Sequence, residues 1–243
     1  LGHVDDVAEE AARLGVAEHA PIDRRRARRG DDEKGAVEVV RAVAPADDRD
    51  VQRGERRGDL RGDAGDGGGN GGGGTDTADY RDKAAGIVVA LNGSGSSIVQ
   101  VGGVNEDTLL AIENVYGGSG NDTLTGDGFA NLFIGYDGDD ILRGGGGNDT
   151  LNGGGGTDTA DYRDKSAAGG IALNGGGGSS VKVGGVIEDT LLSIENVYGG
   201  SSSDTLTGDS AANLFIGFNG DDILRGGGGN DTLNGGNGTD TAD

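Results

Sequence analysis

The chain has 243 residues, 55 of which are glycine, and it contains no cysteine, methionine or tryptophan. Its hydrophobic fraction of 33% is too small for the large apolar core of an ordinary globular domain, so a fold needs stabilisation beyond hydrophobic burial. The formal net charge of −22 disfavours nucleic acids and anionic membranes as partners and favours cations, which a chain without cysteine must bind through oxygen ligands.

Residues 1–70 form a leader with a different composition, since they hold 13 of the 20 basic residues and only 11 of the glycines. Two amphipathic stretches predict an irregular, disordered or helical segment. The basic run Arg24–Arg29 is followed by three acidic residues, which favours a solvated segment over nucleic-acid binding. A frame error in the coding sequence is one explanation of the leader, and a genuine N-terminal segment is the other.

The rest of the chain is a tandem duplication with a period of 82 residues. The string TDTADYRDK begins at Thr75 and again at Thr157, and TDTAD begins a third time at Thr239. We therefore expect one unit over residues 71–161 and a second over residues 162–243. Because the chain begins at Leu1 and stops partway through this pattern, we interpret it as a fragment.

Each unit contains a spacer, at residues 80–116 in the first and 162–198 in the second. The first spacer contains GIVVAL, SIVQVGG and TLLAIENVY, which predict strands separated by Asn-Gly and Gly-Gly turns. We hypothesise that the spacer strands cover an apolar outer face of the neighbouring repeats and make each unit one folding module. The residues of that face are Leu132, Ile134, Ile141, Leu214, Ile216 and Ile223.

Each spacer is followed by five nine-residue repeats, or nonads, at residues 117–161 and 199–243. The first block reads GGSGNDTLT, GDGFANLFI, GYDGDDILR, GGGGNDTLN and GGGGTDTAD. Position 1 is always glycine, position 6 is aspartate in eight of ten nonads and asparagine in two, and position 8 is Leu, Phe or Ala. A pattern of three fixed positions in ten copies is specific.

The nonad pattern predicts an all-β fold made of tight turns and short strands. Glycines at positions 1, 2 and 4 permit positive φ angles, and positions 7 to 9 form the extended segment. Two nonads then make one coil of a parallel stack, in which residues 18 apart lie about 4.8 Å from each other. Only position 8 points inward, giving an apolar ladder of Leu124, Phe133, Leu142, Leu151, Leu206, Phe215, Leu224 and Leu233.

The same stacking places the position-6 side chains in columns along the turns. Unpaired carboxylates at this separation repel each other, and a divalent cation between successive turns relieves the repulsion. Calcium suits such a place, because it accepts six to eight oxygens in flexible geometry and glycine turns leave backbone carbonyls uncovered. The paired positions are Asp122 with Asp140, Asp140 with Asp158, Asp204 with Asp222, Asp222 with Asp240, Asn131 with Asp149, and Asn213 with Asp231. The two pairs with asparagine carry one charge fewer, so we expect weaker binding there.

These nonads resemble the repeats of the RTX (repeats-in-toxin) family over residues 71–79, 117–161 and 199–243. The resemblance implies a parallel β-roll that folds on binding calcium, in a bacterial protein that is exported by type I secretion to the medium or the cell surface. It carries the family's calcium-binding aspartate onto Asp122, Asp140, Asp149, Asp158, Asp204, Asp222, Asp231 and Asp240, and onto Asp76 in an isolated nonad. Ser202 at position 4 and the two position-6 asparagines depart from the family pattern.

Three functional hypotheses follow from the sequence. The first is a structural region that binds several calcium ions, and the second is the non-catalytic part of a secreted enzyme or toxin whose active domain is missing. The third is a repetitive adhesin or surface-layer protein. We expect no enzymatic activity in the fragment itself, because His3 and His19 are the only histidines and neither forms a zinc-binding or triad motif. We also expect no membrane span, since no apolar run approaches the roughly 20 residues that a crossing helix needs.

Overall fold

A computed structural model of the chain describes residues 59–61 and 68–243. The remaining residues, 1–58 and 62–67, lie outside the described part, and so does most of the leader expected over residues 1–70. Residues 59–61 and 68–70 belong to that expected leader but form two strands, which corrects the expectation of an irregular or helical segment at these positions. The first of them pairs with residues 77–79 in the register of the later repeats.

Over its described residues the protein is all-β. Among them, no helix is long and apolar enough to cross a membrane. The strands are short, and in chain order they are β1 (Asp59–Arg61), β2 (Gly68–Asn70), β3 (Thr77–Asp79), β4 (Ile87–Ala90), β5 (Ser96–Val101), β6 (Val104–Leu110), β7 (Asn114–Tyr116), β8 (Thr123–Thr125), β9 (Leu132–Asp137), β10 (Ile141–Arg143), β11 (Thr150–Gly155), β12 (Thr159–Asp161), β13 (Gly169–Ala172), β14 (Ser179–Val183), β15 (Val186–Leu192), β16 (Asn196–Tyr198), β17 (Thr205–Thr207), β18 (Leu214–Asn219), β19 (Ile223–Arg225), β20 (Thr232–Asn237) and β21 (Thr241–Ala242).

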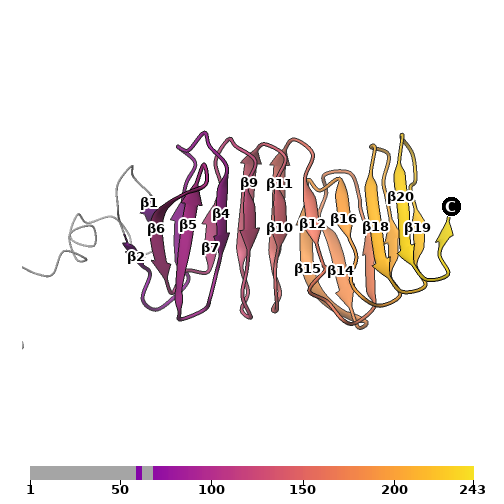
Figure 1. Ribbon diagram of the computed structural model, residues 1–243, viewed down its shortest axis with the longest axis horizontal. Coiled ribbons are helices and arrows are strands. Elements are labelled where there is room, and N and C mark those ends of the chain that lie inside the picture. Colours follow the sequence, from indigo (N-terminus) through magenta and orange to yellow (C-terminus); the bar gives the residue numbers. More distant parts are fainter. Residues whose placement is uncertain (1–58, 62–67) are drawn as a thin grey trace, which may run out of the picture. The chain divides into compact units, whose positions relative to one another are not determined.

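The strands form a parallel β-roll of two facing sheets, with 11 strands in one and 10 in the other (Figure 1). Successive nonads alternate between the sheets, and Ile141 of β10 pairs with Thr123 of β8 and with Thr159 of β12. Each of these partners is 18 residues away. The predicted coil of two nonads is therefore confirmed.

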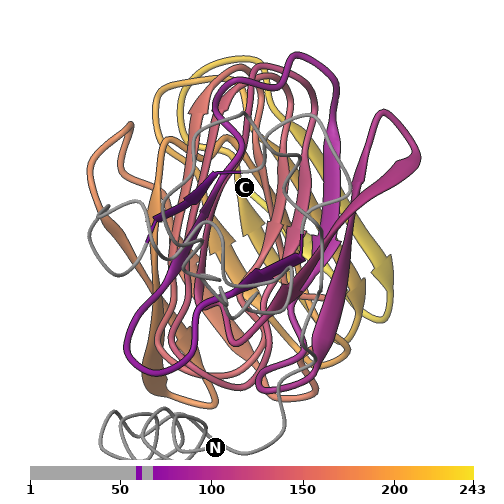
Figure 2. The ribbon, with the colours of Figure 1, turned by 90° about the vertical axis from the view of Figure 1, so that its left-hand side faces the viewer.

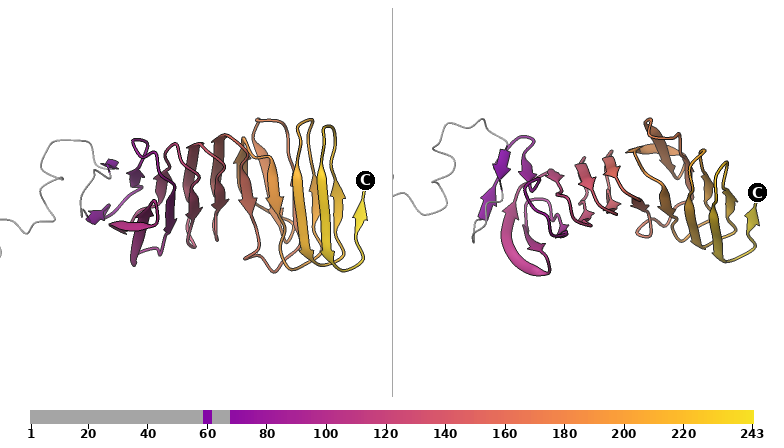
Figure 3. Two further views of the ribbon diagram at one scale, coloured as in Figure 1. Left: turned by 45° about the horizontal axis from the view of Figure 1, so that its top comes forward. Right: turned by 90° about the horizontal axis from the view of Figure 1, so that it is seen from above.

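The spacers continue the roll as additional strands of the sheets. In the first spacer β4, β5 and β6 form an antiparallel meander, which pairs with β8 on one side and with β2 on the other. In the second spacer β13, β14 and β15 do the same between β11 and β17, but in the opposite sheet. The two meanders therefore project from opposite sides of the roll, the first in magenta and the second in orange (Figures 2 and 3).

The alternation of the spacers between sheets follows from the number of nonads. Five nonads make two and a half coils, so β8 and β12, the first and last strands of the first block, lie in one sheet, and the meander that follows them lies in the other. The following spacer therefore begins half a coil out of phase with the previous one. An even number of nonads would place both meanders on the same side.

The interior of the roll is the predicted ladder of position-8 side chains. Leu124, Phe133, Leu142 and Leu151 are fully buried, and their copies in the second block are buried as well, apart from Leu233 in the last coil, which is partly buried. The first spacer adds Ile87, Val89, Val99, Leu109 and Val115 to the same core, and the second spacer adds Ile171, Val181, Leu191 and Val197, with Gly169 at the position of Ile87. One apolar side chain per strand thus stabilises a core that is only one side chain deep per sheet.

The hypothesis that spacer strands cover the outer face of the nonads is wrong. The spacer strands pair edge to edge with the coils above and below, and they do not pack across the outer face. The six outward apolar side chains are half-buried, because each is flanked within its own sheet by the side chains 18 residues away. Leu132, for example, lies between Asn114 and Thr150.

Removal of one rung of the ladder tests this account of the core. Leu142→Ala leaves a cavity in a fully buried position, so we expect a loss of about 2–5 kcal/mol in the free energy of unfolding with calcium in excess. Urea denaturation followed by circular dichroism measures the loss. The control is Ile98→Ala in β5, because Ile98 is 55% exposed. Equal losses for the two variants would contradict the ladder as the main apolar contribution.

Candidate metal sites

The position-6 carboxylates form a hydrogen-bonded column at each row of turns. One oxygen of Asp140, Oδ1, accepts the backbone N–H of Asp122 in the coil before at 2.7 Å, and Asp158 does the same for Asp140 at 2.9 Å. The pairs Asp204–Asp222, Asp222–Asp240, Asn131–Asp149 and Asn213–Asp231 repeat this bond at 2.7–3.0 Å. The expected pairs of residues 18 apart are therefore brought together, with a backbone N–H of one coil bound to a carboxylate of the next.

In four of these carboxylates, and in Asp76 of the isolated nonad, the second oxygen has no donor. Oδ2 of Asp76, Asp140, Asp149, Asp158 and Asp222 is buried, and no hydrogen-bond donor of the described residues reaches it. A buried carboxylate oxygen without a partner is energetically costly. It therefore marks a place where a cation would be bound.

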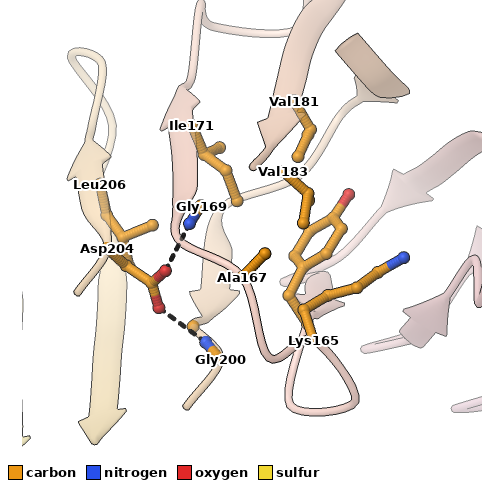
Figure 4. A pocket seen from close by; sticks show the side chains of 11 residues that line it. Lys165, Ala167, Gly169, Ile171, Val181, Val183, Gly200, Asp204 and Leu206 are labelled. Carbon is orange, nitrogen blue, oxygen red and sulfur yellow. Dashed lines mark hydrogen bonds between the residues drawn. The ribbon is translucent and has the colours of Figure 1, made fainter. Parts of the chain in front are cut away.

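The first aspartate of each block differs from the others. Oδ2 of Asp204 accepts the N–H of Gly200 at 2.7 Å, and its Oδ1 accepts the N–H of Gly169 in the spacer at 2.6 Å (Figure 4). Asp122 has the same two bonds, to Gly118 and to Ile87. Both oxygens of these two aspartates already have a donor, so the unpaired oxygens begin one coil further along each column.

Glycine at position 1 is required because the carboxylate folds back against it. A Cβ on Gly135 would lie 1.8 Å from Oδ2 of Asp140, and a Cβ on Gly217 would lie 2.0 Å from Oδ2 of Asp222. Glycine at positions 2 and 4 allows the turns to stack. Gly154 and Gly156 have φ values of +108° and +139°, and a Cβ on Gly156 would lie 1.9 Å from the carbonyl oxygen of Gly138 in the coil before. Backbone carbonyls therefore line the same turns as the unpaired carboxylate oxygens.

This donor set fits calcium. Among residues 59–61 and 68–243, no three acidic or imidazole side chains converge on one point, so a metal ion must take part of its shell from the backbone. Calcium accepts mixed shells of carboxylate and carbonyl oxygens in flexible geometry, whereas metals that need several close side chains do not fit here. Bound in these turns, calcium would neutralise the buried carboxylates.

The pKa values of the column show the same need for a cation. Burial, opposed by the backbone hydrogen bond, raises the pKa of Asp140 and of Asp149 to about 7, and that of Asp158 to about 6. Burial also raises the pKa values of Asp122, Asp204 and Asp222. Without a cation, the column therefore resists ionisation at neutral pH.

The two position-6 asparagines have a structural role that their charge alone does not reveal. The amide Nδ2 of Asn131 donates to the carbonyl of Glu113 at 2.8 Å, and its Oδ1 accepts the N–H of Asp127 at 3.1 Å. Asn213 makes the same two bonds. An aspartate at either position would lose the donor, so part of any gain in charge would be offset.

The ends of the columns contain acidic residues that the sequence analysis missed. The N–H of Asp76 donates to Oε2 of Glu113, and the N–H of Asp158 donates to Oε2 of Glu195, both at 2.9 Å. Asp189 closes the column after Asp149. Counting nine residues back from the first nonad places Glu113 at position 6, so the register could have identified it. At the other end of the roll Asp231 is half-buried and Asp240 is exposed.

Comparison with known families finds four copies of the RTX calcium-binding nonapeptide repeat, over residues 112–128, 125–160, 194–217 and 216–243. No curated protein matches the chain. The matched residues cover the nonad blocks except Asp161 and extend into the spacers to Ile112 and Ile194, so they include Glu113 and Glu195. The repeats of this family bind calcium ions, several in each repeat region.

Blocking one carboxylate pocket tests the role of position 1. In Gly135→Ala the new Cβ collides with Oδ2 of Asp140, so we expect calcium affinity to fall at least tenfold or the roll to fail to form. The control is Gly128→Ala, because a Cβ there meets nothing within 4 Å. Isothermal titration calorimetry compares the two. Equal affinities would contradict the assigned geometry.

The raised pKa values predict that protons partly replace calcium. The carboxyl pKa values in the roll, about 6 to 7 for three of them, lie above the ordinary value of 3.8, so the folded state binds protons more tightly than the unfolded chain. Their contribution to stability is complete below about pH 4 and is lost as the pH rises through about 7. Without calcium, the β signal in circular dichroism should therefore weaken from about pH 5.5 to 8. A signal that grows over this range would contradict the pKa shifts.

Proposed function

We propose that this chain, an RTX-type repeat protein, is the calcium-dependent folding region of a protein that bacteria secrete. The observation that carries the proposal is the set of buried carboxylate oxygens without a donor, found in three successive nonads of the first block, in one nonad of the second and in the isolated nonad of Asp76. Calcium binding would give each of them a partner. The ion would then act as a folding ligand, and its concentration would set the stability of the roll.

The charge of the chain supports this coupling. With a net charge of −22, the chain repels itself when it is compact, and the thin ladder of one apolar side chain per strand opposes that repulsion weakly. Each bound calcium ion removes two negative charges from the balance. The chain would therefore be unfolded in the cytoplasm, where calcium is scarce, and folded outside the cell, where it is abundant.

We propose a structural and binding role rather than catalysis for the columns. Their acidic side chains are 0–5% exposed in the middle of the roll and are bonded to backbone N–H groups of the neighbouring coil. Such carboxylates are placed for a small cation and are inaccessible to an organic substrate. In the whole protein the roll would support an adhesive, toxic or enzymatic function located in other residues.

A calcium titration of the full chain, followed by far-UV circular dichroism, tests the proposal. We expect a cooperative change from a coil to a β spectrum with calcium and no such change with magnesium, which prefers octahedral shells and keeps several waters. Asp140→Asn should raise the calcium concentration at the midpoint. Asp137→Asn is the matched control, because it removes the same charge from an exposed position of the same turn. A coil spectrum at millimolar calcium would overturn the proposal.

A further inference from the structure

The junction between the first nonad block and the second spacer contains a cluster of side chains that the calcium columns do not explain. Here β11 of the last coil pairs with β15 of the spacer, so that Asp149 is followed in its column by Asp189. Oδ1 of Asp189 accepts the N–H of Asp149 at 3.0 Å, as the later aspartate does in the steps between nonads. The difference lies in the second oxygen.

Oδ2 of Asp189 already has a partner. The hydroxyl of Tyr162 donates to it at 3.0 Å, and both side chains are buried. Nonad aspartates in the middle of the blocks lack such a donor. The spacer therefore supplies a hydrogen-bond donor for the second carboxylate oxygen, which has no donor in several of the nonad turns.

The junction also contains a positively charged side chain, that of Lys165. The ammonium Nζ of Lys165 donates to the carbonyl of Gly145 and, at 2.8 Å, to Oε1 of Glu188. Gly145 is position 2 of the nonad that contains Asp149, and its φ is +84°. The side chain of Lys165 is only 12% exposed, so the ammonium lies within the turn, where carbonyl and carboxylate oxygens meet.

We infer that Lys165 is a resident cation that takes the place of calcium at the step between Asp149 and Asp189. The inference rests on the proposed calcium-dependent folding of the nonads, and it excludes the step between Asp149 and Asp189 from the steps that need calcium. The ammonium brings a positive charge to the junction, pairs with Glu188 and occupies the carbonyl of Gly145 that an ion at this step would use. The unpaired Oδ2 of Asp149 is then left for an ion at the step between Asn131 and Asp149. This step is therefore formed without calcium, whereas the steps within a nonad block require it.

The first spacer contains the same arrangement. The side chain of Lys83 pairs with Glu106, and the buried hydroxyl of Tyr80 bonds Asp107. These residues are the copies of Lys165, Glu188, Tyr162 and Asp189 at a spacing of 82. The repeated string DYRDK thus provides a hydroxyl and an ammonium at each entry to a spacer. The calcium-independent meanders would then be the folded seeds onto which the nonad coils assemble.

The number of bound ions tests the inference. Full-length wild-type protein and Lys165→Gln are dialysed to equilibrium against calcium, and the bound metal is counted by elemental analysis. We expect the variant to bind one additional calcium ion. Lys182→Gln is the control, because Lys182 is an exposed lysine of the same spacer, and it should bind the wild-type number. A folded Lys165→Gln variant with the wild-type number would overturn the inference. Wild-type protein that binds no calcium would instead overturn the proposed function.

A second measurement is independent of whether Lys165→Gln folds. Terbium replaces calcium and emits when a nearby tyrosine absorbs light, and Tyr162 lies beside the junction. If Lys165 fills this step, Tyr162→Phe leaves the terbium emission of the otherwise wild-type protein unchanged. A substantial loss of emission in Tyr162→Phe would place an ion at the junction and overturn the inference.

Discussion

The structure depends on one interaction, the buried position-6 carboxylate that binds the neighbouring coil with one oxygen and leaves the other without a donor. The first oxygen sets the register, because it accepts the backbone N–H of the residue 18 positions earlier. The second oxygen lies where the Cβ of position 1 would be, so only glycine fits there. It also creates the need for a cation, because a buried, unpaired carboxylate opposes folding. The glycine at position 1, the 18-residue register and the need for a cation thus all follow from the position-6 carboxylate.

The spacers continue the roll without the glycine turns of the nonads. They keep the apolar ladder continuous through Ile87, Val99 and Val115, but they replace the glycine turns by antiparallel hairpins. Because five nonads make two and a half coils, successive hairpins enter opposite sheets. The blocks are therefore parts of one stack, and the projecting hairpins are its main departure from a uniform solenoid (Figure 2).

Three features that depend on the nine-residue period were predicted from the sequence. They are the 18-residue register, the inward position-8 side chains and the columns of acidic side chains. It did not predict where the spacer strands pair, because their partners lie in coils distant in the sequence and the outer-face interpretation satisfied the same apolar pattern. It also missed the second role of Asn131, whose amide bonds Glu113, since a count of charges contains no information on donors. Tyr136 and Phe218, with φ +79° and +72° at position 2, were equally unexpected, and edge-on contacts with Tyr116 and Tyr198 accompany them.

The most direct test of the account is the location of calcium in a crystal of the calcium-loaded chain, from the anomalous scattering of the ion. We expect anomalous density within coordination distance of Oδ2 of Asp140, Asp158 and Asp222, with backbone carbonyls of the glycine turns completing each shell. The same roll with those three oxygens bonded to protein donors or to water, and with no anomalous density beside them, would contradict it.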